Sequence, residues 1–119
     1  MILGAHVSAS GGLHNAIKNG EELHCNTIQI FVRNPSRWQA KPPTAAIIEK
    51  FRDAWLESPI GEVIVHDIHL SNLASPKTEV LEKSRQQFLE QMELAHVLGL
   101  RYIVTHLGAQ PKHLSLIHI

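Results

Sequence analysis

Short apolar runs alternate along the chain with longer stretches in which apolar residues recur at helical spacing. The short runs cover residues 2–6, 27–31, 62–66 and 101–106, and we interpret each as a strand. The longer stretches predict helices from Leu13 to Leu23, from the N-cap Thr44 to the break at Ser58-Pro59, and from Thr78 to Leu98, where Gly99 follows as a stop. The predicted order is therefore β-α-β-α-β-α-β.

The helical spacing also predicts which side chains face the core. The inward residues are Leu13, Ala16, Ile17, Gly20 and Leu23 in the first helix, Ile47, Ile48, Phe51, Ala54 and Trp55 in the second, and Leu81, Phe88, Met92 and Ala95 in the third. On the outer face of the third helix, Glu79 and Lys83 are spaced to form an ion pair. Residues 33–43 contain three prolines and are predicted to form a loop.

Alternation of strands and helices predicts an α/β fold whose parallel strands are joined by right-handed crossovers. A (β/α)₈ barrel and a doubly wound sheet can both begin in this way. A complete barrel takes about 250 residues, so a chain of 119 residues corresponds to roughly its first half. We assign residues 1–109 to that half barrel. Residues 110–119 show neither a helix start nor a further crossover, and we interpret them as an irregular tail.

Composition narrows the class of protein without naming it. Eleven basic residues balance eleven acidic ones, which argues mildly against a nucleic-acid binder with a wholly basic surface but allows a local basic cluster. No apolar run approaches the roughly 18–20 residues that span a bilayer, and the N-terminus does not resemble a secretory signal. The single cysteine, Cys25, cannot form an internal disulfide. We therefore expect a cytoplasmic protein without membrane association.

Histidine is unusually frequent, with nine in the chain, and three of them end predicted strands: His6, His66 and His106. The carboxyl ends of parallel strands gather ligands and catalytic groups, and neutral imidazole is a favoured zinc ligand. Three converging imidazoles would make a metal site, although each taken singly could equally cap its strand. Asp67 could ligate the metal, orient a ligand or simply form a turn. The spacing matches no zinc motif, so the use of such a metal stays open.

Two loops carry residues suited to nucleic acid. The loop after the second strand holds Arg33, Asn34, Ser36, Arg37 and Trp38, followed by Lys41. Guanidinium groups bind phosphate in a bidentate manner and an indole can stack on a base. The alternative is a solvated loop with Trp38 packed on the following helix. After the third strand, His69 and Leu70 could probe a base stack, or the leucines could anchor the loop.

Several of these segments closely resemble endonuclease IV, the zinc-dependent apurinic/apyrimidinic endonuclease. The opening motif is Gly4-Ala5-His6-Val7-Ser8-Ala9-Ser10-Gly11-Gly12-Leu13. Further matches are Phe31-Val32-Arg33-Asn34 with Arg37-Trp38, His66-Asp67, Leu81-Glu82-Lys83-Ser84-Arg85, and Leu98-Gly99-Leu100 leading to Thr105-His106-Leu107-Gly108. They follow one another in order and at family-like separations over residues 2–109.

The resemblance implies a TIM barrel with three zinc ions that hydrolyses the phosphodiester 5′ to an abasic site in double-stranded DNA, with the full-length form acting as a monomer. It makes His66 and His106 zinc ligands and places His6 near the site without ligating. Arg33, Asn34, Ser36, Arg37 and Trp38 fall in the family's DNA-recognition loop. His69 and Leu70 stand where the family often has a tyrosine and a leucine that enter the duplex, so His69 departs from the pattern. No catalytic side chain besides the metal ligands is implied.

The family's remaining ligands are Glu, Asp and His residues on later strands, and none can be placed in this chain. The resemblance therefore implies an N-terminal fragment that is inactive by itself. Residues 110–119 also leave the family pattern, which continues into a helix, so the resemblance implies that this tail is not native. One alternative is a metal-dependent sugar isomerase or epimerase of the related barrel type. The basic loop at 33–41 favours DNA, since a site for a small sugar has no need of it. A further alternative is a purely structural half barrel, whose unpaired edge strands would promote association or instability.

Overall fold

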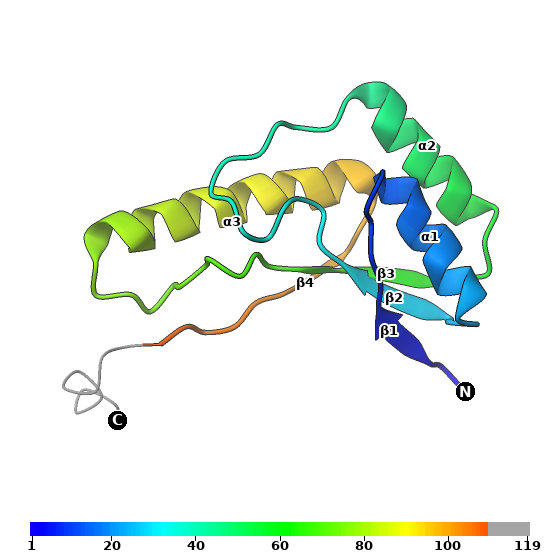
Figure 1. Ribbon diagram of the computed structural model, residues 1–119, viewed down its shortest axis with the longest axis horizontal. Coiled ribbons are helices and arrows are strands. Elements are labelled where there is room, and N and C mark those ends of the chain that lie inside the picture. Colours follow the sequence, from blue (N-terminus) through cyan, green and yellow to red (C-terminus); the bar gives the residue numbers. More distant parts are fainter. Residues whose placement is uncertain (110–119) are drawn as a thin grey trace.

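A computed structural model of the chain describes residues 1–109. Its elements follow the predicted order: β1 (Gly4–His6), α1 (Leu13–Glu22), β2 (Thr27–Ile30), α2 (Ala45–Leu56), β3 (Glu62–His66), α3 (Thr78–Leu98) and β4 (Tyr102–Val104) (Figure 1). The outer strands are shorter than predicted, so that His106 follows β4 rather than ending it. The predicted irregular tail, residues 110–119, lies outside the described residues.

The strands form a parallel sheet whose order is β1-β2-β3-β4. All three helices lie on the same side of it (Figure 1). A doubly wound sheet reverses its strand order and carries helices on both faces, whereas a barrel adds each strand beside the last and keeps every helix outside. The sequential order and the single helical layer therefore identify the half-barrel alternative. In the described part of the chain, β1 and β4 are the edges of the sheet.

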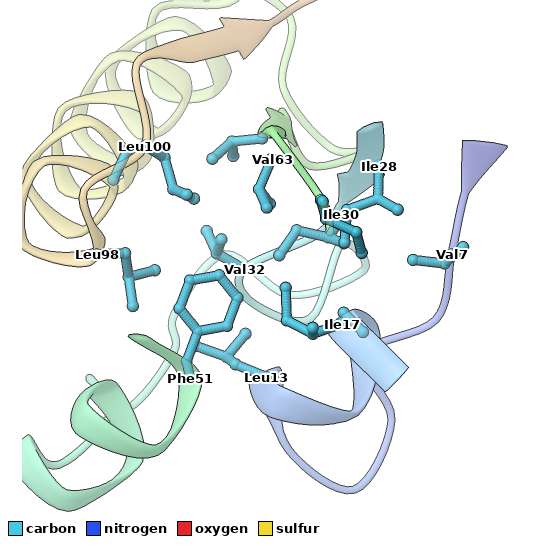
Figure 2. Packing of buried hydrophobic residues seen from close by; sticks show 14 of the residues in the cluster. Val7, Leu13, Ile17, Ile28, Ile30, Val32, Phe51, Val63, Leu98 and Leu100 are labelled. Atoms are coloured by element: carbon cyan, nitrogen blue, oxygen red, sulfur yellow. The ribbon is translucent and has the colours of Figure 1, made fainter. Parts of the chain in front are cut away.

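The hydrophobic core lies between this sheet and the helices (Figure 2). Ile28 and Ile30 of β2 alternate with half-buried neighbours, as expected of strands whose two faces meet different surroundings. From the helical side, Ile17 and Phe51 are fully or almost fully buried. The core face points away from the strand-end histidines, because His66 is one residue out of phase with the buried Val65.

Most of the predicted inward positions of the first two helices are buried or half-buried, but Leu23 and Ile47 are exposed. Leu23 is the C-cap residue of α1, where the helix no longer holds its side chain against the sheet. The predicted cap at the start of α2 is confirmed, since Oγ1 of Thr44 accepts a hydrogen bond from the Ile47 amide at 3.3 Å. None of the helices in the described residues is long and apolar enough to cross a membrane.

The long helix α3 departs most from its predicted pattern. Met92, predicted to face inward, is 49% exposed. Of the other three predicted inward residues, Ala95 is buried, and Leu81 and Phe88 are half-buried. The remaining buried positions of α3 are Ser84, Gln87, Gln91 and Leu98. Only the C-terminal part of α3 lies over the sheet, while its first half extends beside the loops that follow the strands (Figure 1). There it faces polar groups rather than the core, so its buried residues are polar. The predicted Glu79–Lys83 ion pair is present at 3.0 Å, and Gly99 ends the helix in the left-handed conformation, at φ 83°.

Candidate functional site

The structure brings four histidines together at the carboxyl ends of the strands. His6 ends β1, His66 ends β3, His106 follows β4, and His69 lies in the loop after β3. The ring of His66 is central: its centroid lies 5.3 Å from that of His106, 5.9 Å from His6 and 6.4 Å from His69. The three histidines predicted to converge therefore do so, because parallel register carries each strand end to the same rim.

Phe31 packs against three of the four histidines and was not predicted as a site residue. Its ring lies 4.6 Å from that of His6, 5.1 Å from His66 and 4.9 Å from His69. Phe31 directly follows Ile30, the last residue of β2, a strand with no histidine at or just after its end. Its position at a strand end was the available signal. The apolar ring separates and orients the imidazoles around it.

The hydrogen bonds of His66 fix its tautomer. Its Nδ1 lies 2.6 Å from the backbone carbonyl oxygen of Asp67. A carbonyl can only accept, so Nδ1 of the neutral ring carries the hydrogen and Nε2 keeps a free lone pair. Histidines that ligate metals are commonly held in this way, with the second ring nitrogen donating to a carbonyl or carboxylate.

His6 is held differently. The Nε2 of Gln29 lies 3.0 Å from Nδ1 of His6 and donates to it, so the neutral ring of His6 carries its hydrogen on Nε2. Burial lowers the pKa of His6, and the nearby His66 and His69 lower it further when they are charged. A neutral imidazole with a hydrogen on Nε2 is a donor rather than a ligand. The resemblance implies that His6 stands near a metal without binding it, and this stays a prediction.

The donors of this rim fit part of a zinc site. Zinc prefers imidazole, thiolate and carboxylate ligands and binds four of them in structural sites. His66 and His106 are adjacent and chemically suitable. Within residues 1–109, however, no three His, Cys, Asp or Glu side chains are arranged to hold a metal ion together. The described residues thus offer a pair of imidazoles, which requires further ligands to complete a zinc coordination shell.

Asp67 is buried and fully engaged, with an exposed fraction of only 2%. Its Oδ1 accepts hydrogen bonds from the Ile68 amide at 2.8 Å, from Gln87 at 3.0 Å and from Gln91 at 2.6 Å. Its Oδ2 accepts one from Thr105 at 2.7 Å. Burial alone would raise the pKa of Asp67, but the hydrogen bonds from Thr105, Gln87 and Gln91 outweigh it and lower the pKa overall. The carboxylate therefore anchors the loop after β3 to α3 and to the segment after β4, and its oxygens are not free for a metal.

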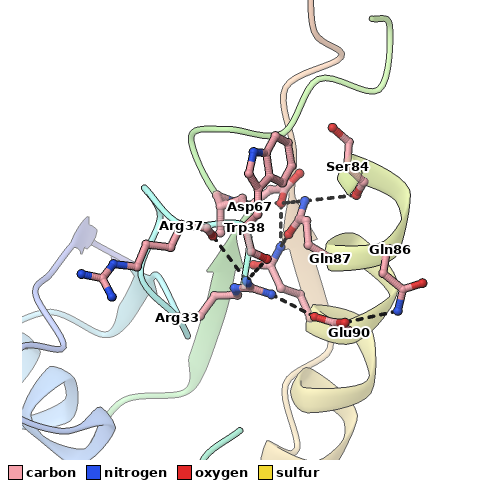
Figure 3. A network of polar contacts seen from close by, with 10 residues as sticks. Arg33, Arg37, Trp38, Asp67, Ser84, Gln86, Gln87 and Glu90 are labelled. Carbon is pink, nitrogen blue, oxygen red and sulfur yellow. Dashed lines mark hydrogen bonds and ion pairs between the residues drawn. The ribbon is translucent and has the colours of Figure 1, made fainter. Parts of the chain in front are cut away.

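In the basic loop, the two arginines have opposite environments (Figure 3). The Arg33 side chain is only 5% exposed. Its Nη1 lies 3.2 Å from Oε2 of Glu90 on α3, and its Nη2 donates to the backbone carbonyls of Arg37 and Trp38. Arg37 is exposed, and its side chain points away from this network. Of the two predicted phosphate-binding arginines, only Arg37 presents its guanidinium to the surface.

The other members of the loop are arranged around the same turn. Asn34 and Ser36 are exposed, and Oδ1 of Asn34 accepts a hydrogen bond from the Ser36 amide at 2.9 Å. Trp38 is half-buried, with the ammonium of Lys83 lying 6.0 Å from its ring centre. The indole therefore packs beside α3. The sequence had suggested, as the alternative to stacking on a base, that Trp38 packs on the helix after the loop, which is α2.

The loops after β2 and β3 contact each other. The amide of His69 donates to the carbonyl oxygen of Pro35 at 2.9 Å, which joins the loop at 33–38 to the loop at 69–72. His69 is exposed and Leu70 half-buried. The loop at 69–72 is held by Asn72. Its Oδ1 accepts a hydrogen bond from the Ala109 amide at 3.1 Å, and its Nδ2 donates to the Ala109 carbonyl oxygen at 3.0 Å. The His69–Pro35 hydrogen bond thus brings together the two loops that hold the predicted nucleic-acid residues, of which Arg33 is buried.

Comparison with known proteins identifies the family. A model of the family described as the xylose isomerase-like TIM barrel matches residues 17–115. The chain belongs to this family. A relative named probable endonuclease 4, from Geobacter sulfurreducens, is 43% identical over 107 residues, which make up 90% of this chain and 36% of the relative. The chain spans less than two fifths of the length of that relative.

Solved structures support the same conclusion. The endonuclease IV of Thermus thermophilus superposes with a TM-score of 0.83 at 30% identity, covering 91% of this chain and 40% of that protein. A candidate xylose isomerase from Rhodospirillum rubrum gives a TM-score of 0.67 at 11% identity over 98% of this chain and 43% of that protein, a likeness of fold alone. The predicted half barrel and the resemblance to endonuclease IV are both confirmed. Within the xylose isomerase-like TIM barrel family, this chain groups with endonucleases by sequence.

Proposed function

We propose that this chain is the N-terminal part of a zinc-dependent endonuclease that hydrolyses the phosphodiester 5′ to abasic sites in double-stranded DNA. The observation that carries the proposal is the joining of two features on one rim. The His66–His106 pair, with ring centroids 5.3 Å apart, lies at the carboxyl ends of the strands, and the His69–Pro35 hydrogen bond joins the loop that follows His66 to the loop that presents Arg37. The relatives named endonuclease 4 and endonuclease IV support the same reading.

In this proposal, His66 and His106 hold zinc together with ligands from outside the described residues. Zinc, when bound, lowers the pKa of water and neutralises charge that develops on a phosphate undergoing hydrolysis. The free lone pair on Nε2 of His66 suits it to this role. His6 contributes a hydrogen-bond donor at Nε2, which can be directed at a phosphate oxygen. Because the metal supplies the chemistry, no nucleophilic side chain is required.

The DNA would be held by the two loops. Arg37 would bind a phosphate, and Asn34 and Ser36 would add hydrogen bonds to the DNA backbone. The exposed part of the Trp38 indole would stack on a base. His69 and Leu70 would enter the duplex at the abasic position, where a missing base leaves the least stacking to disrupt. A sugar isomerase, the alternative, needs a small enclosed site and has no use for an exposed arginine and an indole beside its metal.

We further propose that residues 1–109 do not cleave DNA without the rest of the barrel, because two imidazoles are too few to hold a catalytic zinc cluster.

A free, buried Cys25 agrees with a reducing compartment such as the cytoplasm.

A nicking assay tests the function directly. The protein expressed from its complete reading frame is incubated with a labelled duplex that holds one tetrahydrofuran abasic analogue, with and without prior removal of zinc. We expect incision immediately 5′ to the analogue, loss of incision after zinc removal and recovery when zinc is returned. His66→Ala should abolish incision. A zinc-loaded protein that leaves the duplex intact but isomerises an aldose would overturn the proposal.

A further inference from the structure

We infer that Arg33 is a positioning residue, which ties the loop at 33–38 to α3 through Glu90, and that Arg37 alone of the two arginines binds a DNA phosphate. The inference rests on the proposed function and refines it. It also reverses the simplest expectation from the sequence, in which both arginines of the loop contact DNA.

The burial of Arg33 is the first argument. Its side chain is 5% exposed, although it lies in a loop whose neighbours Asn34, Ser36 and Arg37 are all exposed. Both terminal nitrogens of its guanidinium already donate: Nη1 to Glu90, and Nη2 to two backbone carbonyls. A phosphate could reach these nitrogens only by opening the loop and displacing partners that the charge needs while it is buried.

The partners of Arg33 show what it does. By donating to the carbonyls of Arg37 and Trp38, its guanidinium closes the loop from inside. The Arg37 amide adds a bond to the Asn34 carbonyl at 3.4 Å across the same turn. With its backbone held in this way, Arg37 directs its side chain outward (Figure 3). Since Glu90 neutralises Arg33, the outward positive charge of residues 33–38 comes from Arg37.

Glu90 is itself held in position. Its Oε1 accepts a hydrogen bond from Gln86 at 3.2 Å, which leaves Oε2 for Arg33. On the same helix, Gln87 and Gln91 donate hydrogen bonds to Asp67. The polar side of α3 therefore supports two loops at once: the one that would read DNA and the one that follows the ligand His66.

The two roles predict opposite effects for the loss of Glu90. If Arg33 bound phosphate, Glu90→Gln would remove a competing carboxylate, and DNA would bind more tightly. If Arg33 positions the loop, Glu90→Gln leaves a buried guanidinium without its counter-ion and loosens the loop. DNA would then bind more weakly, by roughly tenfold, because the loop must be ordered when DNA arrives.

The experiment compares Glu90→Gln, Arg33→Gln, the double variant, Arg37→Gln and the control Glu82→Gln in the protein expressed from its complete reading frame. Glu82 is exposed on the same helix and pairs with Arg85, so its loss removes the same charge without touching the loop. Binding to the abasic-analogue duplex is measured across a range of salt concentrations, and KM and kcat are measured for incision.

We expect Glu90→Gln and Arg33→Gln to weaken binding alike, the double variant to be no weaker than either, and the salt dependence to be unchanged. KM should rise while kcat stays near that of the parent protein. Arg37→Gln should instead lower the slope of log K against log salt by about 1, as the loss of one phosphate contact does. Tighter or unchanged binding by Glu90→Gln, or a reduced salt slope for Arg33→Gln, would overturn the inference.

A second measurement separates this inference from the proposed function. Hydrogen exchange of the amides in residues 34–38 reports the closure of the loop without any DNA. Faster exchange of these amides in Glu90→Gln, with unchanged exchange in Glu82→Gln, supports a positioning role of the Arg33–Glu90 pair even if the parent protein fails to cut the abasic duplex. Equal exchange in both variants would refute that positioning role, whatever the protein is found to cut.

Discussion

The Nδ1 atom of His66 lies 2.6 Å from the backbone carbonyl oxygen of Asp67. This contact joins the strand-end imidazole to the most heavily hydrogen-bonded carboxylate of the described chain. The peptide that accepts from His66 is fixed because the Asp67 side chain is fixed, by Gln87 and Gln91 from α3 and by Thr105 after β4. The orientation of a candidate metal ligand therefore depends on a helix about twenty residues further along the chain.

Loss of His66 should lower the zinc content of the protein expressed from its complete reading frame. His66→Ala removes the Nε2 lone pair, so we expect fewer bound zinc equivalents, and a weakened visible absorption when cobalt replaces zinc. Mass spectrometry of the metal content checks the first and absorption spectroscopy the second. His96→Ala is the matched control, because His96 is exposed in the last turn of α3, and it should keep the parent's metal content. Equal zinc in both variants would remove His66 from the ligand set.

The buried polar stripe of α3 should be required for stability. Gln91→Leu removes a donor from the Asp67 carboxylate and leaves that charge under-bonded, at a cost of about 1–3 kcal/mol in the free energy of unfolding. Urea denaturation measures the change. Glu93→Leu, an exposed substitution on the same helix, should shift the free energy by no more than about 0.5 kcal/mol. If Gln91→Leu were as neutral as its control, the network around Asp67 would be incidental to stability.

The ring at position 69 should set the strength of damage recognition. His69 is exposed next to Phe31 and offers less stacking area than a tyrosine. We expect His69→Tyr to bind an abasic-analogue duplex more tightly, by about 1 kcal/mol, and His69→Ala to bind it more weakly. Fluorescence anisotropy with abasic and intact duplexes checks both. Variants that shift the two duplexes equally would mean that residue 69 does not enter the abasic position.

The loop after β4 should require a glycine at position 108. Gly108 has φ 96°, and a Cβ built there would overlap Oδ1 of Asn72, which accepts from the amides of Ala74 and Ala109. Gly108→Ala should therefore strain the loop by about 1–3 kcal/mol and speed hydrogen exchange at Ala74 and Ala109. Gly61→Ala is the control, since a Cβ there would meet only a backbone oxygen at 3.8 Å. Protection that is equal in the two variants would contradict the clash.

Much of the architecture could be predicted from the sequence. Period-two and period-3.6 patterns report which side of an element meets an apolar surface, and this was enough to give the element order and the capping role of Thr44. Parallel topology then carried the histidines to one rim. The pattern failed at Met92, Ile47 and Leu23, which are exposed. Met92 lies on the outer face of α3, and Leu23 caps the end of α1.

The sequence by itself determined the alternation of strands and helices, the histidines at or just after the strand ends, and the segments that resemble endonuclease IV. Only the tertiary structure decided between a half barrel and a doubly wound sheet, through the strand order β1-β2-β3-β4. It also decided that Arg33 is buried and Arg37 exposed, that Asp67 is an anchor, and that Phe31 packs against three of the clustered histidines. The physical reason is the range of the interactions. The periodicity of apolar residues is set by neighbours in the sequence, so it can be recognised without the fold. The hydrogen-bond partners of a buried charge lie far along the chain: Glu90 is 57 residues from Arg33, and Gln91 is 24 residues from Asp67.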